Sequence, residues 1–135
     1  MLLEYSTQGF NQIVDITPQV SKAVEQAGLR KGVVHLFVAG STAALTTIEY
    51  EPGAVQDLQR ALDRIAPMDG VYAHNEAWGD GNGYAHLRAA LLKPGLCIPI
   101  EQGRLALGTW QQIVLIDFDN RPRQRQVLLT LTAAV

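Results

Sequence analysis

The chain has 135 residues, of which 47% are hydrophobic and 18% are charged, and its formal net charge is −2. That length suits one domain with its own hydrophobic core, over residues 1–135. A nucleic-acid-binding or polybasic membrane-surface protein normally shows a basic face, so we expect neither partner. We expect no signal peptide, since the first residues lack its pattern, and no apolar stretch approaches the roughly 20 residues that span a bilayer. The sequence has a single cysteine. We therefore expect a cytoplasmic protein.

The first part of the chain predicts two strands and a helix. Strands are expected at residues 2–6 and 12–16, joined in a hairpin around Gly9. A Thr-Pro pair ending at Pro18 then has the pattern of a helix start, and Gly28 is well placed to end that helix.

The next segment predicts two strands and a second helix. Residues 33–38 are apolar at nearly every position, which indicates a strand covered on both faces, with His35 as a core histidine. The β-branched run 41–48 is expected to be its partner strand. Pro52 then opens an amphipathic helix that Pro67 stops.

The remaining half begins with an aperiodic stretch. Residues 72–83 hold aromatic, charged, imidazole and glycine residues without periodicity, which indicates an ordered functional loop. A short helix is expected over residues 84–92. Three strands follow, within residues 96–100, 105–118 and 125–132. The sum is an α+β fold, with a mixed sheet of about seven strands and two to three helices.

The strongest candidate site lies around this loop. His74 and His86 flank Asp80 and Asn82, and imidazole with carboxylate suits zinc or another divalent ion, or acid–base work near pH 7. The competing interpretation is that both histidines are ordinary surface or hydrogen-bonding residues. Their concentration in one polar loop makes His74, Asp80, Asn82 and His86 the predicted catalytic residues, and His74, Asp80 and His86 the predicted metal ligands.

The glycine-rich stretch 79–83 resembles two known motifs and fits neither. A dinucleotide-binding fingerprint that starts at Gly81 requires glycine where His86 stands, and a calcium loop requires glutamate where Leu91 stands. Glycines followed by a helix start still favour an anion, such as a phosphate with magnesium held by Asp80 and Asn82. A tight structural turn is the alternative.

Other polar groups offer further phosphate contacts. Ser41 and Thr42 supply hydroxyls between two apolar strands. Arg121, Arg123 and Arg125 alternate, so on an extended segment they point the same way and either bind a phosphate or form a solvated face.

Two further features are expected to be structural. Trp110 follows a glycine inside an expected strand and suits a pocket wall or an interface. Cys97 has the pattern of an inert strand residue.

Several segments together resemble one protein family. They are residues 41–49, 72–74, 80–87, 103–111 and 123–125, of which the most specific is Leu107-Gly108-Thr109-Trp110-Gln111. In order and spacing they resemble the YjbQ family, often called secondary thiamine-phosphate synthases, over essentially the whole chain. Many members have a histidine immediately before a Thr-Thr pair, whereas this chain has Gly40-Ser41-Thr42. If that histidine is a metal ligand elsewhere, this chain lacks it.

The resemblance implies a small α+β fold, a homotrimer, and an enzyme that joins hydroxymethylpyrimidine diphosphate to thiazole phosphate with release of pyrophosphate. The polar motif positions of the family fall on Glu49, His74, Asp80, Asn82, His86, Trp110, Gln111 and Arg125. Substrate or phosphate binding is accordingly expected at Ser41, Thr42, Glu49, Trp110, Gln111 and Arg125, with magnesium or zinc as cofactor. The alternatives are a metal-dependent hydrolase of a small phosphorylated metabolite, and a non-catalytic trimer that binds a metal or metabolite.

Overall fold

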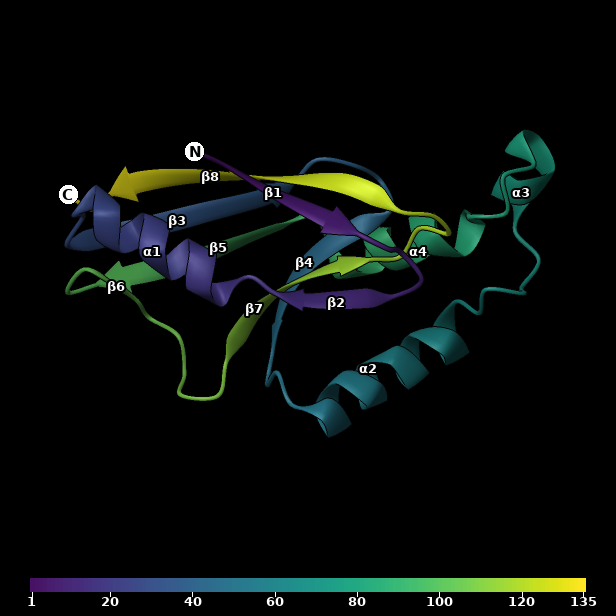
Figure 1. Cartoon of the computed structure of the whole chain (residues 1–135), viewed down its shortest axis with the longest axis horizontal. Coiled ribbons are helices and arrows are strands. Elements are labelled where there is room, and N and C mark those ends of the chain that lie inside the picture. Colours follow the sequence, from purple (N-terminus) through teal and green to yellow (C-terminus); the bar gives the residue numbers. More distant parts are fainter.

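The computed structural model describes residues 1–135, and it folds into eight strands and four helices (Figure 1). In chain order the elements are β1 (Leu2–Thr7), β2 (Gln12–Asp15), α1 (Thr17–Ala27), β3 (Lys31–Val38), β4 (Ala43–Ile48), α2 (Pro52–Ile65), α3 (Ala73–Trp78), α4 (Gly83–Leu92), β5 (Gly95–Glu101), β6 (Arg104–Leu105), β7 (Gln112–Asp117) and β8 (Arg123–Ala133). The α+β class is confirmed. None of the helices has the length and apolar character needed to cross a membrane.

The strands form two sheets rather than one mixed sheet. The larger has the order β1-β8-β3-β5-β6 and the smaller has the order β2-β7-β4, with every neighbouring pair antiparallel. The predicted hairpin of the first two strands is wrong, because Gly9 turns the chain from β1 in one sheet to β2 in the other. Its left-handed backbone lies against the carbonyl oxygens of Asp119 and Arg121, where a Cβ atom would clash. The expected pairing of residues 41–48 with β3 is also wrong, since β4 pairs with β7.

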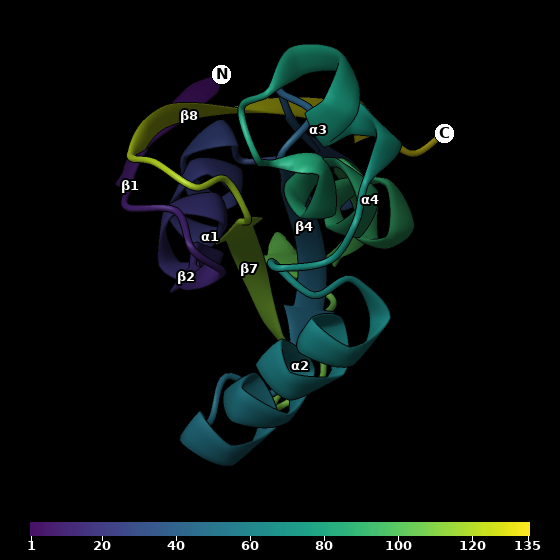
Figure 2. The same ribbon diagram turned by 90° about the vertical axis from the view of Figure 1, so that its right-hand side faces the viewer.

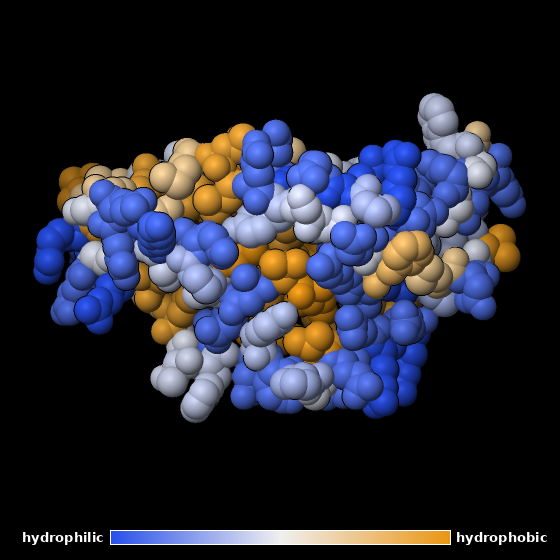
Figure 3. Space-filling model, viewed as in Figure 1, coloured by the Kyte–Doolittle hydropathy of each residue, from blue (hydrophilic) through white to orange (hydrophobic).

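The five-stranded sheet buries one face and exposes the other. In β3, Val34, Leu36 and Val38 are buried, whereas His35 and Phe37 are exposed. The expectations of a strand covered on both faces and of His35 in the core are therefore wrong. His35 Nδ1 lies instead 3.2 Å from Sγ of Cys97, which is also exposed. Figure 3 shows apolar surface gathered at the upper left, where β8 and the N-terminus lie in Figure 1.

Two apolar clusters form the core. The first packs α1 against the inner face of the larger sheet, and the second packs α4 against β4 and β7 (Figure 2). In the second cluster, Tyr84, Ala85 and Ala89 of α4 meet Val114 and Ile116 of β7. This packing fixes the start of α4 beside the start of β4, which is where the predicted site residues meet.

The long strand expected over residues 105–118 is broken. β6 ends at Leu105 and β7 begins at Gln112, because a turn with a hydrogen bond from Gln111 N to Gly108 O interrupts the extended chain. The turn leaves Trp110 72% exposed.

Candidate functional site

The polar stretch 72–83 contains a short helix, which the sequence analysis did not predict. α3 begins after the extended residue Tyr72 and ends at Gly79, whose φ of 71° lies in the left-handed region. Tyr72 anchors its start by donating a hydrogen bond from Oη to Pro67 O over 2.6 Å. Since none of its six residues is buried, α3 packs only loosely on the rest of the protein. A helix this short has no amphipathic period to detect.

The structure brings the two predicted histidines together. The ring of His74 on α3 and the ring of His86 on α4 have their centres 4.3 Å apart, tilted by 40°. Asp80 lies beside them, with Oδ1 3.6 Å from His74 Nδ1. That distance is too long for a hydrogen bond, and His74 Nδ1 is enclosed without a partner. Two imidazoles and a carboxylate therefore converge, as the sequence predicted.

The surroundings of His86 favour its neutral form. Burial lowers the pKa of His86, and the neighbouring His74 lowers it further. Asp119, Asp80 and a hydrogen bond to the Ser41 main chain act in the opposite direction on this pKa, but they do not outweigh the first two causes. At neutral pH His86 therefore keeps an unprotonated ring nitrogen.

Asn82, the residue before α4, is buried against a carboxylate that sequence reasoning missed. Its Nδ2 donates to Asp119 Oδ1 over 3.3 Å, while its Oδ1 has no partner. Burial alone would raise the pKa of Asp119, but hydrogen bonds from the Asn120 main chain, Arg123, Asn82 and Thr42 hold it below its ordinary value. The available signal was a carboxylate directly after an apolar strand, where an unpaired charge is costly.

Arg125 forms a buried ion pair with Asp117, another residue that the sequence analysis did not select. Nε and Nη2 of Arg125 donate to the two oxygens of Asp117 over 2.7 and 2.8 Å, and Nη2 also donates to Thr42 Oγ1 over 2.7 Å. Arg123 pairs with Asp119 over 2.7 Å. Arg123 and Arg125 thus do not form a solvated face, whereas Arg121 is exposed. The Arg125 charge is neutralised inside the protein, where it positions Thr42.

A hollow of about 220 Å³ opens beside His86. It is lined almost entirely by small residues, namely Gly40, Ser41, Ala43, Ala89, Ala90 and Pro94. Its walls come from the loop before β4 and the first residue of that strand, from the middle and last turn of α4, and from Pro94. The main-chain amides of Gly83, Ala85 and His86 at the start of α4 already donate to Asn75 and Asn82, so the predicted anion site at that helix start is not formed by them.

Three other predicted residues lie at the opposite end of β4. Ala43 pairs with Asp117 near the histidines, whereas Ile48 pairs with Gln112 at the far end. Five residue steps separate these ends of β4, which is about 17 Å along a strand. The far end holds the predicted residues Glu49, Trp110 and Gln111. Within one chain they do not join the histidine site.

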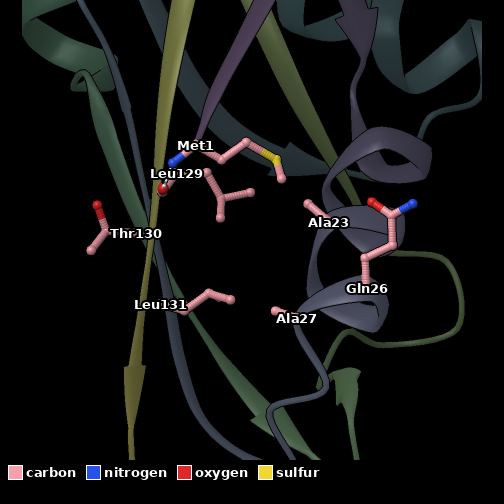
Figure 4. Close-up of a pocket in the computed structure, with 7 residues that line it drawn as sticks. All are labelled: Met1, Ala23, Gln26, Ala27, Leu129, Thr130 and Leu131. Carbon is pink, nitrogen blue, oxygen red and sulfur yellow. Dashed lines mark hydrogen bonds between the residues drawn. The ribbon is translucent and has the colours of Figure 1, made fainter.

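Two further observations bear on ligands. The structure contains no group of three or more His, Cys, Asp or Glu side chains placed to hold a metal ion. A larger hollow of about 410 Å³ lies between α1 and β8, lined mainly by apolar side chains such as Ala27 and Leu131 (Figure 4). No predicted site residue lines this larger hollow.

Comparisons with known proteins agree on one family. A family model described as "UPF0047 protein YjbQ-like" matches residues 1–134. A UPF0047 protein from Archaeoglobus fulgidus is 39% identical over 118 residues, which is 87% of this chain and 89% of the relative. Solved relatives include a YbjQ-like protein of unknown function from Sulfolobus solfataricus, with a TM-score of 0.90, 30% identity and coverage of 99% of this chain and 97% of the other. A second, from Clostridium acetobutylicum, has a TM-score of 0.84, 38% identity and coverage of 96% and 99%. The chain therefore belongs to the YjbQ-like UPF0047 family.

Proposed function

We propose that this protein is a thiamine-phosphate synthase-like enzyme, which joins hydroxymethylpyrimidine diphosphate to thiazole phosphate and releases pyrophosphate. The activity is the one implied by the resemblance of its motifs. The structural observation that supports it is the His74–His86 pair beside a hollow whose small lining residues suit a single flat ring. Candidate ligand groups from three separate segments converge there, which is typical of an active site.

The proposed reaction makes modest demands on the protein. The lone pair of the thiazole nitrogen forms a bond to the pyrimidine methylene carbon, while the bond from that carbon to the diphosphate oxygen breaks and its electron pair leaves with diphosphate. The nucleophile is neutral, so catalysis consists of positioning the two rings and stabilising the departing charge. The N–H groups of the imidazoles and the Ser41 hydroxyl are the nearest donors to the hollow.

The proposal includes a divalent ion, but no step of the reaction is derived from it. Magnesium or zinc would neutralise diphosphate charge, and His74, Asp80 and His86 are the side chains nearest to one another there. As arranged, these three do not form a metal-holding group. We therefore derive no step through a metal, and titration with each ion tests this expectation.

One observation favours a second candidate, hydrolysis of a small phosphorylated metabolite. The lowered pKa of His86 leaves a neutral imidazole near pH 7, which is the form that removes a proton from an attacking water. Thiamine-phosphate synthesis needs no such base. Release of inorganic phosphate from a single phosphorylated substrate, without a second substrate, distinguishes the hydrolase.

We also propose the homotrimer that the resemblance implies. The outer face of the larger sheet exposes Leu2, Phe37 and Leu128 side by side, since Leu128 pairs with both of the others. Burial of such a row between subunits is favourable. Sedimentation equilibrium tests the trimer, and a monomer at micromolar concentration would contradict it. A trimer that binds these ligands without turnover would indicate the non-catalytic alternative.

The activity test compares wild type with two single-residue variants. Wild type, His86→Ala and the control Arg60→Ala, at an exposed position of α2, are incubated with both thiamine precursors, with and without magnesium, and thiamine phosphate is measured. We expect product from wild type and Arg60→Ala, and a loss of about 100-fold or more in His86→Ala, in the range typical of a positioned acid–base group. Equal turnover in all three removes His86 from the mechanism, and no turnover in any overturns the synthase proposal.

A further inference from the structure

We infer that this site takes a ligand bearing an N–H donor, and that Asn82 Oδ1 is the group that recognises it. The inference rests on the proposed function and specifies its substrate class: an amino-substituted heteroaromatic ring rather than any small phosphorylated compound. It makes Asn82 a specificity residue and Asp119 the residue that positions it.

Asp119 fixes which way the Asn82 amide faces. The fully buried carboxylate of Asp119 accepts four hydrogen bonds, from Asn82 Nδ2 (3.3 Å), Thr42 Oγ1 (3.1 Å), Arg123 Nε (2.7 Å) and the Asn120 main chain (2.8 Å). An ionised carboxylate only accepts hydrogen bonds, so Asn82 must turn its NH₂ group toward it. The amide oxygen therefore faces the other way, and the amide does not flip freely.

The Asn82 amide oxygen, held in this orientation, has no hydrogen-bond partner within the protein. Asn82 is 5% exposed, and its Oδ1 is enclosed without a hydrogen bond. Buried acceptors are nearly always paired, so an unpaired one within this cluster of polar groups indicates a missing donor. The enclosed Nδ1 of His74 is a second unpaired polar atom in the same region.

The missing partner is an N–H group rather than a hard cation. Magnesium prefers carboxylate oxygens, yet the buried carboxylates of Asp117 and Asp119 are already occupied by arginine, hydroxyl and amide donors. The remaining carboxylate is the exposed Asp80. A neutral amide oxygen that lacks a partner matches an amino group on an aromatic ring.

Access to Asn82 requires a small movement of the segment before α4. Gly83 N donates to Asn75 Oδ1 over 2.9 Å, and a Cβ atom at Gly83 would lie 2.6 Å from Tyr72 Cβ. Residues 72–75 thus lie directly on the start of α4. The segment carries no buried side chain, and Gly79 and Gly81 at its end have left-handed backbones. It is the loosely held part of the site through which a ligand reaches the amide.

The first test varies the ligand and leaves the protein intact. Calorimetry compares wild-type binding of 4-amino-5-hydroxymethyl-2-methylpyrimidine phosphate with that of the analogue carrying methyl in place of the 4-amino group. Loss of the donor should weaken binding by about 10- to 100-fold, because the buried oxygen is left unpaired. Equal affinities, or binding of neither compound, would overturn the inference. The inference would also be overturned if magnesium or zinc alone bound wild type but not Asn82→Ser, and if the amino group made no difference to the affinity of the ligand.

The second test reverses the orientation of the Asn82 side-chain amide. In Asp119→Asn, the oxygen of the new side chain keeps the bonds from Arg123 and Thr42, and its NH₂ takes the place that faces Asn82, with loss of the bond from the Asn120 main chain. Asn82 then turns its own NH₂ toward the ligand. The preference for the amino compound should be lost, and the affinity of the 4-oxo analogue should rise relative to that of the amino compound. Arg123→Gln perturbs the same cluster but keeps the Asp119 carboxylate. Its preference for the amino compound over the 4-oxo analogue should therefore match that of wild type. If wild type prefers the amino compound but forms no thiamine phosphate, only the synthase proposal is refuted. If folded Asp119→Asn keeps the wild-type preference for the amino compound, only this inference is refuted.

Discussion

Replacing Arg125 by methionine should destabilise the fold strongly, because it leaves a buried carboxylate without its counter-charge. Arg125 is 6% exposed, and Asp117 is completely buried. The pair makes two short hydrogen bonds, of 2.7 and 2.8 Å. After the substitution, Asp117 keeps only hydrogen bonds from Thr7 and from the main chain of Asp119.

Breaking one partner of such a buried pair costs about 3–5 kcal/mol, which is a large share of the about 5–15 kcal/mol that holds a domain together. With a urea m-value of about 2 kcal/mol per molar, the unfolding midpoint should fall by about 1.5–2.5 M. Arg121 is exposed and makes no ion pair, so the control Arg121→Met should change stability by less than about 0.5 kcal/mol.

Urea unfolding followed by circular dichroism measures both variants. Adding Asp117→Asn to Arg125→Met should recover more than half of the loss, since it removes the stranded charge. A loss below about 1 kcal/mol in Arg125→Met would refute this reasoning, because it would place the Asp117 carboxylate in contact with water. Failure of the second substitution to help would show that lost packing, not charge, dominates.

The remaining predictions concern the start of α4. Gly83→Ala places a Cβ atom 2.6 Å from Tyr72 Cβ and should displace α3 and separate the histidine rings, whereas Gly108→Ala meets only ordinary contacts at 3.6 Å or more. The loss of nuclear Overhauser contacts between the two rings in the first variant alone checks this. Because the pKa of folded His86 is lowered, the unfolded chain binds more protons below pH 6.5, so stability should fall as pH drops through 6.5 toward the folded pKa. Urea midpoints at pH 8 and pH 5.5 should differ less in His86→Asn than in wild type, and an equal difference would contradict the lowered pKa.

Local signals in the sequence predicted most of the helices and strands. The Thr-Pro start and Gly28 end of α1 are visible as residue types, and α1 has those bounds. Pairing between strands depends instead on distant partners, and β1 meets β8 more than a hundred residues away. Nothing local distinguishes that arrangement from a hairpin, so the hairpin prediction failed. His35 was misplaced for a related reason, because an apolar strand does not show whether its second face is covered.

The sequence predicted which histidines lie together, but it did not predict the buried carboxylates of Asp117 and Asp119 beside them. Histidine and asparagine in an aperiodic glycine-rich loop are visible as unusual, and the fold does bring His74 and His86 together. Asp117 and Asp119 sit at the end of an apolar strand, where sequence alone gives no indication of which cation or amide they meet. Their role follows only from the packing of β8 and α4 against β7.

The most direct test follows the ring protons of the three histidines by NMR during titration with hydroxymethylpyrimidine diphosphate. His74 and His86 share the proposed site, whereas His35 lies on the exposed outer face of the larger sheet and serves as an internal control. The account predicts that the signals of His74 and His86 shift together with one dissociation constant while His35 stays fixed. No shift of the paired histidines at saturating ligand, or a shift of His35 alone, would contradict it.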